Sequence, residues 1–185
     1  MLGDVFLRVI SGSARGMKLL CADGNDVRPT LDRVKESVFN MIAFDIADSC
    51  VLDLFSGSGA LGIEALSRGA RKCTFLDSSS SSISITKKNL EATRLLHSAI
   101  VINSDSIDFL EKTDQKFDII FIDPPYNSDL YEKSLLKIRE NKLLTNNGFI
   151  VLEYDNVITP EFDCCGFEII KEKKYGRGKI LLMKE

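Results

Sequence analysis

The sequence lacks any apolar run long enough to cross a bilayer, because polar or charged residues interrupt every hydrophobic stretch before about twenty residues. The first ten residues, MLGDVFLRVI, also lack the basic lead and apolar core of a signal peptide. These absences argue against a membrane-spanning or a secreted protein. We therefore expect a cytoplasmic protein with no membrane partner.

Metal-binding and disulfide patterns are missing as well. The five cysteines form no C-x-x-C pair and their number is odd, which argues against a zinc ribbon and against a disulfide framework. The single histidine, His97, has no cysteine or acid cluster around it, so a surface or capping role is expected rather than catalysis. The sequence therefore predicts reduced cysteines and no bound metal.

The chain has no excess of positive charge. Its formal net charge of -3 at pH 7 argues against a protein that coats nucleic acid over its whole surface. A basic face on an otherwise acidic body is still compatible with this total. The length of 185 residues, with 44% hydrophobic and 28% charged residues, is typical of a single globular domain.

From residue 50 onward, short apolar segments alternate with segments of helical pattern. Near-continuous Val, Ile, Leu and Phe indicate strands buried on both faces, as in a parallel sheet covered by helices. Two later apolar segments flank YGRG and predict an antiparallel hairpin at the sheet edge. We predict an α/β, doubly wound, mostly parallel seven-stranded sheet of Rossmann-like type with this C-terminal hairpin. The seven apolar segments are CVLDLF, KCTFLD, AIVIN, FDIIFID, GFIVLEY, GFEII and GKILLM.

Residues 1–48 precede this pattern and predict a small extension. The segments VFLRVI and MKLLC bracket SGSARG, as in a hairpin. The following segment, RPTLDRVKESVFNMIAF, has the apolar period of an amphipathic helix, with Thr30 placed to cap it. The predicted organisation is therefore an N-terminal hairpin and helix over 1–48, followed by one domain over 49–185.

A glycine-rich turn follows the first of the buried strands. VLDLFSGSGALG places Gly57, Gly59 and Gly62 in G-x-G-x-x-G spacing, and Asp77 ends the next strand, which is a pattern of nucleotide binding. Asp53 lies four residues before the first glycine, where a carboxylate would repel a pyrophosphate and attract an amino group. S-adenosylmethionine carries such an amino group as well as a sulfonium, so we predict it as the cofactor.

Acids follow four successive predicted strands. Asp53, Asp77, Asp105 and Asp123 each lie at the carboxyl end of a strand, the edge at which open α/β sheets bind ligands. We expect Asp77 to bind the ribose hydroxyls. Asp105 and the backbone amide of Ser106 are expected to bind the adenine ring.

The fourth of these strands ends in the rigid sequence DPPY. Pro124 and Pro125 cannot donate to a sheet ladder, and they restrict the backbone after Asp123. The Asp123 carboxylate and the Pro124 carbonyl can accept both hydrogens of an exocyclic amine on a planar base, while Tyr126 stacks on the ring. This turns the amine lone pair toward a sulfonium methyl, and Asp123 can take the departing proton. The predicted catalytic residues are Asp123, Pro124, Pro125 and Tyr126.

The motifs DLFSGSG and DPPY together resemble those of class I S-adenosylmethionine-dependent amino-methyltransferases. With RVISGSARGMKL and RPTLDRVKESVFNMI added, nearly the whole chain resembles the bacterial methyltransferase D family, which modifies a guanine N2 in small-subunit (16S) ribosomal RNA. Many members have Phe at Tyr126 and Glu at Asp77, substitutions that keep the chemistry. The resemblance implies an enzyme with these cofactor-binding residues: Asp53, Ser56, Gly57, Gly59, Asp77, Ser78, Asp105 and Ser106.

The N-terminal segment concentrates basic residues around the predicted hairpin and helix, and phosphate contacts need such clusters. The resemblance implies that residues 1–48 contact ribosomal RNA and that residues 49–185 form the methyltransferase domain. We expect a monomer acting on RNA within a small-subunit particle. The predicted RNA-binding residues are Arg8, Arg15, Lys18, Arg28 and Arg33.

Other functions share parts of this pattern. An adenine-N6 methyltransferase acting on DNA or RNA would use the same two acceptors of DPPY. A noncatalytic RNA-binding assembly factor could retain the fold, although it would not need all four acids. A dehydrogenase would share the glycine turn but would give no role to Asp123 and the prolines.

Overall fold

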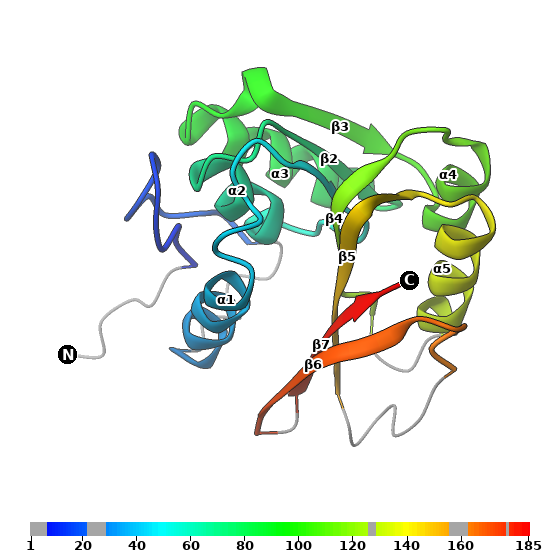
Figure 1. Ribbon diagram of the computed structural model, residues 1–185. Helices are drawn as coiled ribbons and strands as arrows, with labels where there is room; N and C mark the ends of the chain where they lie inside the picture. Colours follow the sequence, from blue (N-terminus) through cyan, green and yellow to red (C-terminus); the bar gives the residue numbers. More distant parts are fainter. Residues whose placement is uncertain (1–6, 22–28, 126–128, 156–162, 177) are drawn as a thin grey trace.

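The computed structural model is built around one seven-stranded sheet, with strand order β3-β2-β1-β4-β5-β7-β6 (Figure 1). Strands β1 to β5 are parallel, whereas β7 pairs antiparallel with both β5 and β6. The predicted doubly wound, mostly parallel sheet with a C-terminal hairpin is therefore confirmed. The structure describes residues 7–21, 29–125, 129–155, 163–176 and 178–185.

Most strands occupy the apolar segments that the sequence indicates, whereas β6 extends beyond GFEII into a charged, exposed segment. The strand β5 is longer than its apolar pattern and begins at the polar segment before Gly148. The strands are β1 (Cys50–Asp53), β2 (Lys72–Asp77), β3 (Ala99–Asn103), β4 (Phe117–Ile122), β5 (Leu144–Asp155), β6 (Glu168–Tyr175) and β7 (Gly178–Lys184).

Helices cover both faces of the sheet. Figure 1 shows α1, α2 and α3 on one side and α4 and α5 on the other. Each face buries its own hydrophobic core, with Phe75 and Phe121 on the α1 to α3 side and Leu52 and Ile120 on the α4 to α5 side. The helices are α1 (Pro29–Met41), α2 (Ala60–Ser67), α3 (Ser80–Ala92), α4 (Ser106–Lys112) and α5 (Leu130–Glu140).

Local capping explains where two helices begin. Ser79, within the serine run, accepts a hydrogen bond from the Ser82 amide at the start of α3. Asp105 caps α4 in the same way. The prediction that Thr30 caps α1 is wrong, because the helix already includes Pro29, a residue well suited to the first helical position.

The predicted N-terminal hairpin is present and short. In the described residues Arg8 and Lys18 form an antiparallel bridge, and the Leu19 amide donates to the Leu7 carbonyl at 2.7 Å. The loop packs on α2, where the Ser67 side chain accepts from the Ala14 amide and donates to the Ser11 carbonyl. Contacts with the helix therefore hold the turn of this hairpin against the sheet domain.

A buried ionic cluster, which we call the Glu64 cluster, fastens this extension to the sheet domain. The Glu64 carboxylate on α2 is fully buried and accepts from the backbone amides of Ile10 at 2.7 Å and Ser11 at 3.0 Å. It also lies 3.4 Å from the Lys35 ammonium of α1 and 2.7 Å from the Arg68 guanidinium. Lys35 in turn donates to the Arg8 carbonyl, so the cluster joins the loop, α1 and α2.

The helix α1 also contacts the far end of the chain. The Ser37 hydroxyl of α1 lies within hydrogen-bond distance of the Lys173 ammonium and of the Tyr175 hydroxyl, both on β6. This contact lies at the end of β6 that pairs with the start of β7. The N-terminal helix and the C-terminal hairpin therefore support each other against the same side of the sheet.

Other expectations from composition concern cysteines, His97, metals and membranes. The five cysteines are free thiols. His97 is exposed in a short 3-10 turn, Leu96–Ser98. Among the described residues no group of His, Cys, Asp and Glu is arranged to hold a metal ion. No helix in the part of the chain that the structure describes has the length and apolar character needed to cross a membrane.

Candidate active site

One cavity of about 640 Å³ lies at the carboxyl edge of the parallel strands. All four acids singled out from the sequence line it, because each follows the end of a parallel strand. A second depression, of about 700 Å³, lies at the opposite edge beside Asp118 and Gly148 and contains none of the predicted site residues. The predicted site residues lining the first cavity are Asp53, Ser56, Gly57, Asp77, Ser78, Asp105, Ser106, Asp123, Pro124 and Pro125.

The glycine-rich turn forms one wall of this cavity. Gly57 and Gly59 have φ angles of 52° and 79°, in the left-handed region that glycine adopts without strain. The turn is held by hydrogen bonds from the Thr86 hydroxyl to the Gly57 carbonyl and from the Asn89 amide to the Ser58 carbonyl. Gly59 itself lies at the cap of α2, outside the cavity lining.

The third glycine of the motif has a packing role. A side chain at Gly62 would place its Cβ 2.3 Å from the Phe75 ring and 2.7 Å from the Cys73 sulfur. Only glycine therefore lets α2 lie this close to β2. The Gly62 amide donates to the Asp53 carboxylate at 2.9 Å, which fixes that carboxylate at the base of the turn.

Asp53 is almost fully buried beside two other acids. Burial raises the pKa of its carboxyl to about 7, the negative charges of Asp123 and Asp77 add to the rise, and the Gly62 hydrogen bond opposes it. The described residues provide no cation within ion-pair distance of this carboxylate. A ligand cation at this position would therefore relieve an existing electrostatic cost.

Asp77 is held by the turn that it faces. Its Oδ2 accepts from the Gly57 amide at 2.9 Å and its Oδ1 accepts from the Ser79 amide at 2.8 Å. Each carboxylate oxygen has a further lone pair, so the side chain can still accept from ligand hydroxyls. These two bonds fix the direction in which Asp77 presents its oxygens.

Asp105 has a structural role that the sequence interpretation left out. Its Oδ1 accepts from the amides of Ile107 and Asp108 and so caps α4. Both of these bonds end on Oδ1, which leaves Oδ2 without a hydrogen bond to the described residues. Ser106, the first residue of α4, is buried beside it.

Ser56 carries a buried polar atom without a partner. Its hydroxyl oxygen is buried and has no hydrogen-bond partner among the described residues, although the residue lines the cavity. An unpaired buried hydroxyl is costly, and a polar ligand group in the cavity would satisfy it. Together with the turn glycines and the three acids, this hydroxyl fits a ligand that carries hydroxyl and amino groups, as S-adenosylmethionine does.

The DPP segment closes the other side of the cavity. Asp123 follows the end of β4 and has surface open to the cavity, while the protein around it raises the pKa of its carboxyl to about 6 by desolvation. Pro124 is buried and Pro125 is exposed. Tyr126, the fourth predicted catalytic residue, lies outside the described residues.

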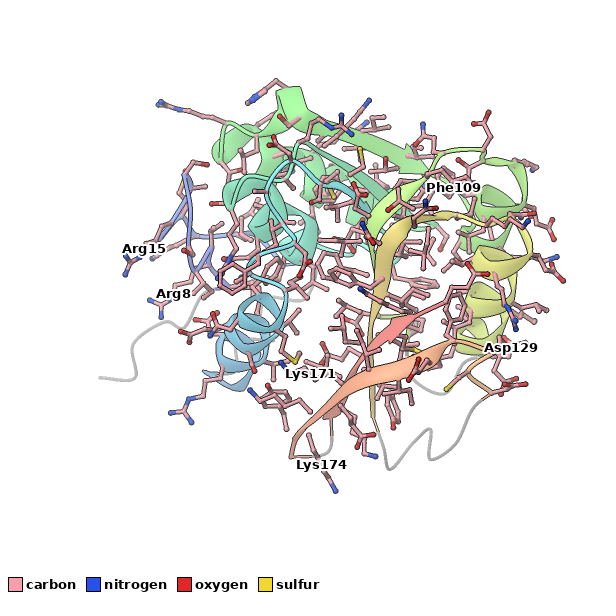
Figure 2. All side chains as sticks on the ribbon, viewed as in Figure 1. Arg8, Arg15, Phe109, Asp129, Lys171 and Lys174 are labelled. Carbon is pink, nitrogen blue, oxygen red and sulfur yellow. The ribbon has the colours of Figure 1, made fainter. Side chains whose placement is uncertain are left out.

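The described basic residues among those predicted to contact RNA lie apart from the cavity. Arg8 and Arg15 are exposed on the N-terminal loop and point outward (Figure 2). Arg8 pairs with Asp32 at 3.0 Å, and Arg33 is exposed on α1. Lys18 is exposed at the bridge to Arg8, and Arg28 lies outside the described residues. The four described residues therefore lie on a surface of the extension that is separate from the cavity.

Two acids with tertiary roles were not identified from the sequence. In the sequence, nothing distinguishes Glu64 from an exposed helical residue, but in the structure it is fully buried. Glu153 lies in β5 on the side of Asp123 away from the glycine turn. The only signal for it in the sequence was an acid inside the otherwise apolar segment GFIVLEY.

This strand order, the glycine turn after β1 and the acids along one sheet edge define the class I methyltransferase fold. Comparison with solved structures agrees. A candidate methyltransferase from Escherichia coli, yhhF, superposes with a TM-score of 0.85 at 34% identity, over 96% of this chain and 97% of that one. A more distant neighbour, a candidate methyltransferase complexed with SAH, has a TM-score of 0.70 at 20% identity over 86% of this chain and 50% of that one, which shows a shared fold.

Sequence comparison identifies the family. A family model described as conserved hypothetical protein 95 matches residues 7–184. Ribosomal RNA small subunit methyltransferase D of Haemophilus influenzae is 40% identical over 176 residues, which cover 92% of this chain and 89% of that protein. The protein of the same name from Escherichia coli is 40% identical over 151 residues, 82% of this chain and 76% of that protein. The chain therefore belongs to the methyltransferase D family.

Replacing Asp53 by Asn is expected to stabilise the free protein at about pH 8. The folded-state pKa of about 7 lies above the ordinary value. The native protein therefore binds more protons than the unfolded chain between about pH 4 and 7, and its free energy of unfolding falls as the pH rises. The Asp53→Asn variant has no carboxyl to ionise here, so its free energy of unfolding does not fall in this way. At pH 8 we expect it to exceed the wild-type value by at least about 1 kcal/mol, since one pKa unit corresponds to about 1.4 kcal/mol.

Urea unfolding of both proteins at about pH 5 and pH 8 measures this effect. The gain should be smaller at the lower pH, where less of the buried carboxyl is forced to ionise. A difference between the two proteins that does not change with pH would contradict the raised pKa.

Proposed function

We propose that this protein transfers the methyl group of S-adenosylmethionine to the N2 amine of a guanine in 16S ribosomal RNA of the small subunit. One observation carries the proposal: the acceptor pair formed by Asp123 and the Pro124 carbonyl shares a cavity with the glycine turn and Asp53. The names of the relatives, which are ribosomal RNA small subunit methyltransferases, support the RNA substrate.

Residues of the cavity have the chemistry to hold the cofactor. S-adenosylmethionine supplies a methyl group activated by a positively charged sulfur. Asp53 would face its amino group, Asp77 its ribose hydroxyls and the Ser56 hydroxyl one of its polar atoms, since each of these protein groups has an unused acceptor or an unsatisfied charge. Ser106 and Asp105 would border the adenine ring.

The DPP segment would orient the amine that receives the methyl group. An exocyclic amine is a weak nucleophile because its lone pair is delocalised into the ring. With both N2 hydrogens accepted by Asp123 and the Pro124 carbonyl, the lone pair turns out of the ring plane toward the methyl group. The new N–C bond forms as the methyl–sulfur bond breaks, and the N2 proton passes to Asp123.

The proposal is tested by incubating the protein with labelled S-adenosylmethionine and small-subunit particles from cells that lack it. Digestion of the RNA and identification of the nucleosides should yield labelled N2-methylguanosine. Labelled N6-methyladenosine would instead identify adenine as the base that is methylated. The absence of any labelled nucleoside, with the cofactor bound, would favour a noncatalytic assembly factor.

The exposed basic residues of the extension are proposed to hold RNA phosphates, with residues 1–48 serving as the RNA-contacting part and residues 49–185 as the methyltransferase domain. We further propose that the enzyme is a cytoplasmic monomer that acts on RNA within an assembling small-subunit particle. Arg8 and Arg15 lie on one loop, outside the cavity, so they could bind the RNA without touching the reacting groups.

Replacing Arg8 and Arg15 together by Ala is expected to weaken RNA binding and to reduce its salt dependence by about two phosphate contacts, because each neutralised phosphate releases a counterion. Titration of small-subunit RNA at several salt concentrations measures both quantities. The matched control replaces Lys112 and Lys133 by Ala; these exposed lysines lie on α4 and α5, on the other face of the sheet (Figure 1). Equal salt slopes in the two double variants would contradict the assignment.

A further inference from the structure

Glu153 lies next to Asp123 on the neighbouring strand. Ile122 of β4 is paired in register with Leu152 of β5, so the next position on each strand brings Asp123 and Glu153 together. Two positions earlier, Phe121 and Val151 both belong to the core under α1 to α3. Because side chains alternate along a strand, Asp123 and Glu153 both project on that same side of the sheet.

This carboxylate has no partner among the residues that the structure describes. Glu153 is half-buried and makes neither a hydrogen bond nor an ion pair with them. Its neighbour on β7 is the buried apolar residue Ile180. Burial, with a contribution from the charge of Asp123, raises the pKa of its carboxyl to about 8. A partly buried carboxylate that lacks donors is stabilised when a ligand supplies them.

The position of Glu153 relates it to the substrate base. The acids at the cofactor end of the cavity, Asp53 and Asp77, lie on β1 and β2, on one side of β4. Glu153 lies on β5, on the other side of β4. A base whose amine is held at Asp123 and faces the cofactor can present the adjoining edge of its ring to the β5 side, where Glu153 lies.

Guanine and adenine differ at that edge. On the Watson–Crick edge, the ring nitrogen beside the N2 amine of guanine is N1–H, a donor, whereas the ring nitrogen beside the N6 amine of adenine is N1, an acceptor. A carboxylate pairs with the donor and is repelled by the acceptor lone pair. A site built to bond one hydrogen rejects analogues without it, because the buried polar group is then left unpaired.

We infer that Glu153 accepts the N1–H of the target guanine and selects guanine over bases that lack this hydrogen. This inference rests on the proposed methylation of a guanine N2, and it adds the residue that reads the base. Asp123 and the Pro124 carbonyl accept from any exocyclic amine, so they do not distinguish guanine from adenine. Glu153 supplies the missing discrimination.

The test compares guanine with 2-aminopurine, which keeps the exocyclic amine but has a bare N1 acceptor. The guanosine that the wild-type protein methylates is first located in the RNA of small-subunit particles. RNA carrying either guanosine or 2-aminopurine ribonucleoside at that position is then made by ligation and assembled into particles. Single-turnover methylation rates on the two particles, measured at about pH 9 so that the Glu153 carboxyl is ionised, give a preference ratio for each protein.

We expect the wild-type protein to prefer guanosine. Glu153→Gln should reduce this preference at least about tenfold, because its amide can donate to the N1 of 2-aminopurine. Glu172→Gln is the matched control: it removes a carboxylate that pairs with Lys179 elsewhere on the hairpin, and it should leave the ratio unchanged. Cofactor affinity, measured by calorimetry, should be the same in all three proteins, since Glu153 does not line the cavity in the described residues.

Two results would overturn the inference while leaving the proposed function intact. One is an equal preference ratio in the wild-type protein and Glu153→Gln. The other needs no variant: wild-type protein that methylates 2-aminopurine as fast as guanosine does not read N1–H. Failure of the wild-type protein to methylate any guanosine would instead overturn the proposed function on which the inference rests.

Discussion

Asp123→Asn is expected to lower the single-turnover rate of RNA methylation by at least about tenfold, a modest value for a group that takes a proton in the reaction. The substitution keeps the size of the side chain but replaces one acceptor oxygen by an NH2 group, which opposes a hydrogen of the substrate amine. An interaction made mainly in the transition state affects kcat and kcat/KM alike, whereas lost binding alone raises KM. Single-turnover and steady-state methylation of small-subunit particles separate these cases.

The pH dependence of the rate provides an independent check on Asp123. Because the pKa of Asp123 is about 6 and the ionised form accepts the proton, the wild-type rate should rise with pH through about 6. The variant should lack this rise and retain its affinity for S-adenosylmethionine in calorimetry. A variant with the wild-type rate and pH profile would reduce the DPP segment to a structural turn.

Glu64→Gln is expected to lower the free energy of unfolding by about 3 kcal/mol, since removal of one partner leaves a buried charge uncompensated. Lys35, only 5% exposed, would lose its counter-charge, and two backbone amides would lose a charged acceptor. Burial lowers the pKa of Lys35, so the deficit should shrink as the pH rises and this ammonium can lose its proton. Urea unfolding at several pH values measures both effects.

A second substitution separates charge from packing. Lys35→Met in the Glu64→Gln background removes the stranded charge while keeping an unbranched side chain, and it should recover part of the lost free energy. Glu172→Gln, which breaks an exposed pair on the hairpin, should leave stability close to that of the wild-type protein. If Glu64→Gln lowers the free energy of unfolding no more than this control does, the Glu64 cluster does not stabilise the fold.

The sheet and the line of acids could be predicted because both depend on local rules. Buried strands show as apolar segments, and acids after four of them must meet at one edge of a parallel sheet. Asp105 shows the limit of this reasoning, since the same residue obeys a second local rule as a helix cap. Its capping role was open to prediction from the helical pattern that follows it.

Glu64 and Glu153 could not be assigned in this way. Two of the partners of Glu64, the Ile10 and Ser11 amides, lie 54 and 53 residues earlier in the chain. The position of Glu153 beside Asp123 depends on the register between β4 and β5, which the apolar pattern alone does not specify. The N-terminal hairpin could be predicted from its two flanking segments, whereas its packing on α2 through Ser67 depends on tertiary contacts.

The contact between Ser37 and Tyr175 spans 138 residues, and it sets an order of events during synthesis. The ribosome releases α1 early, yet the strand that receives Ser37 is among the last to emerge, and β7, which joins β6 to the sheet, emerges later still. Closing such a long loop is slow compared with forming the parallel strands between. On a growing chain, the cofactor edge of β1 to β4 can therefore assemble before α1 has formed its contact with β6.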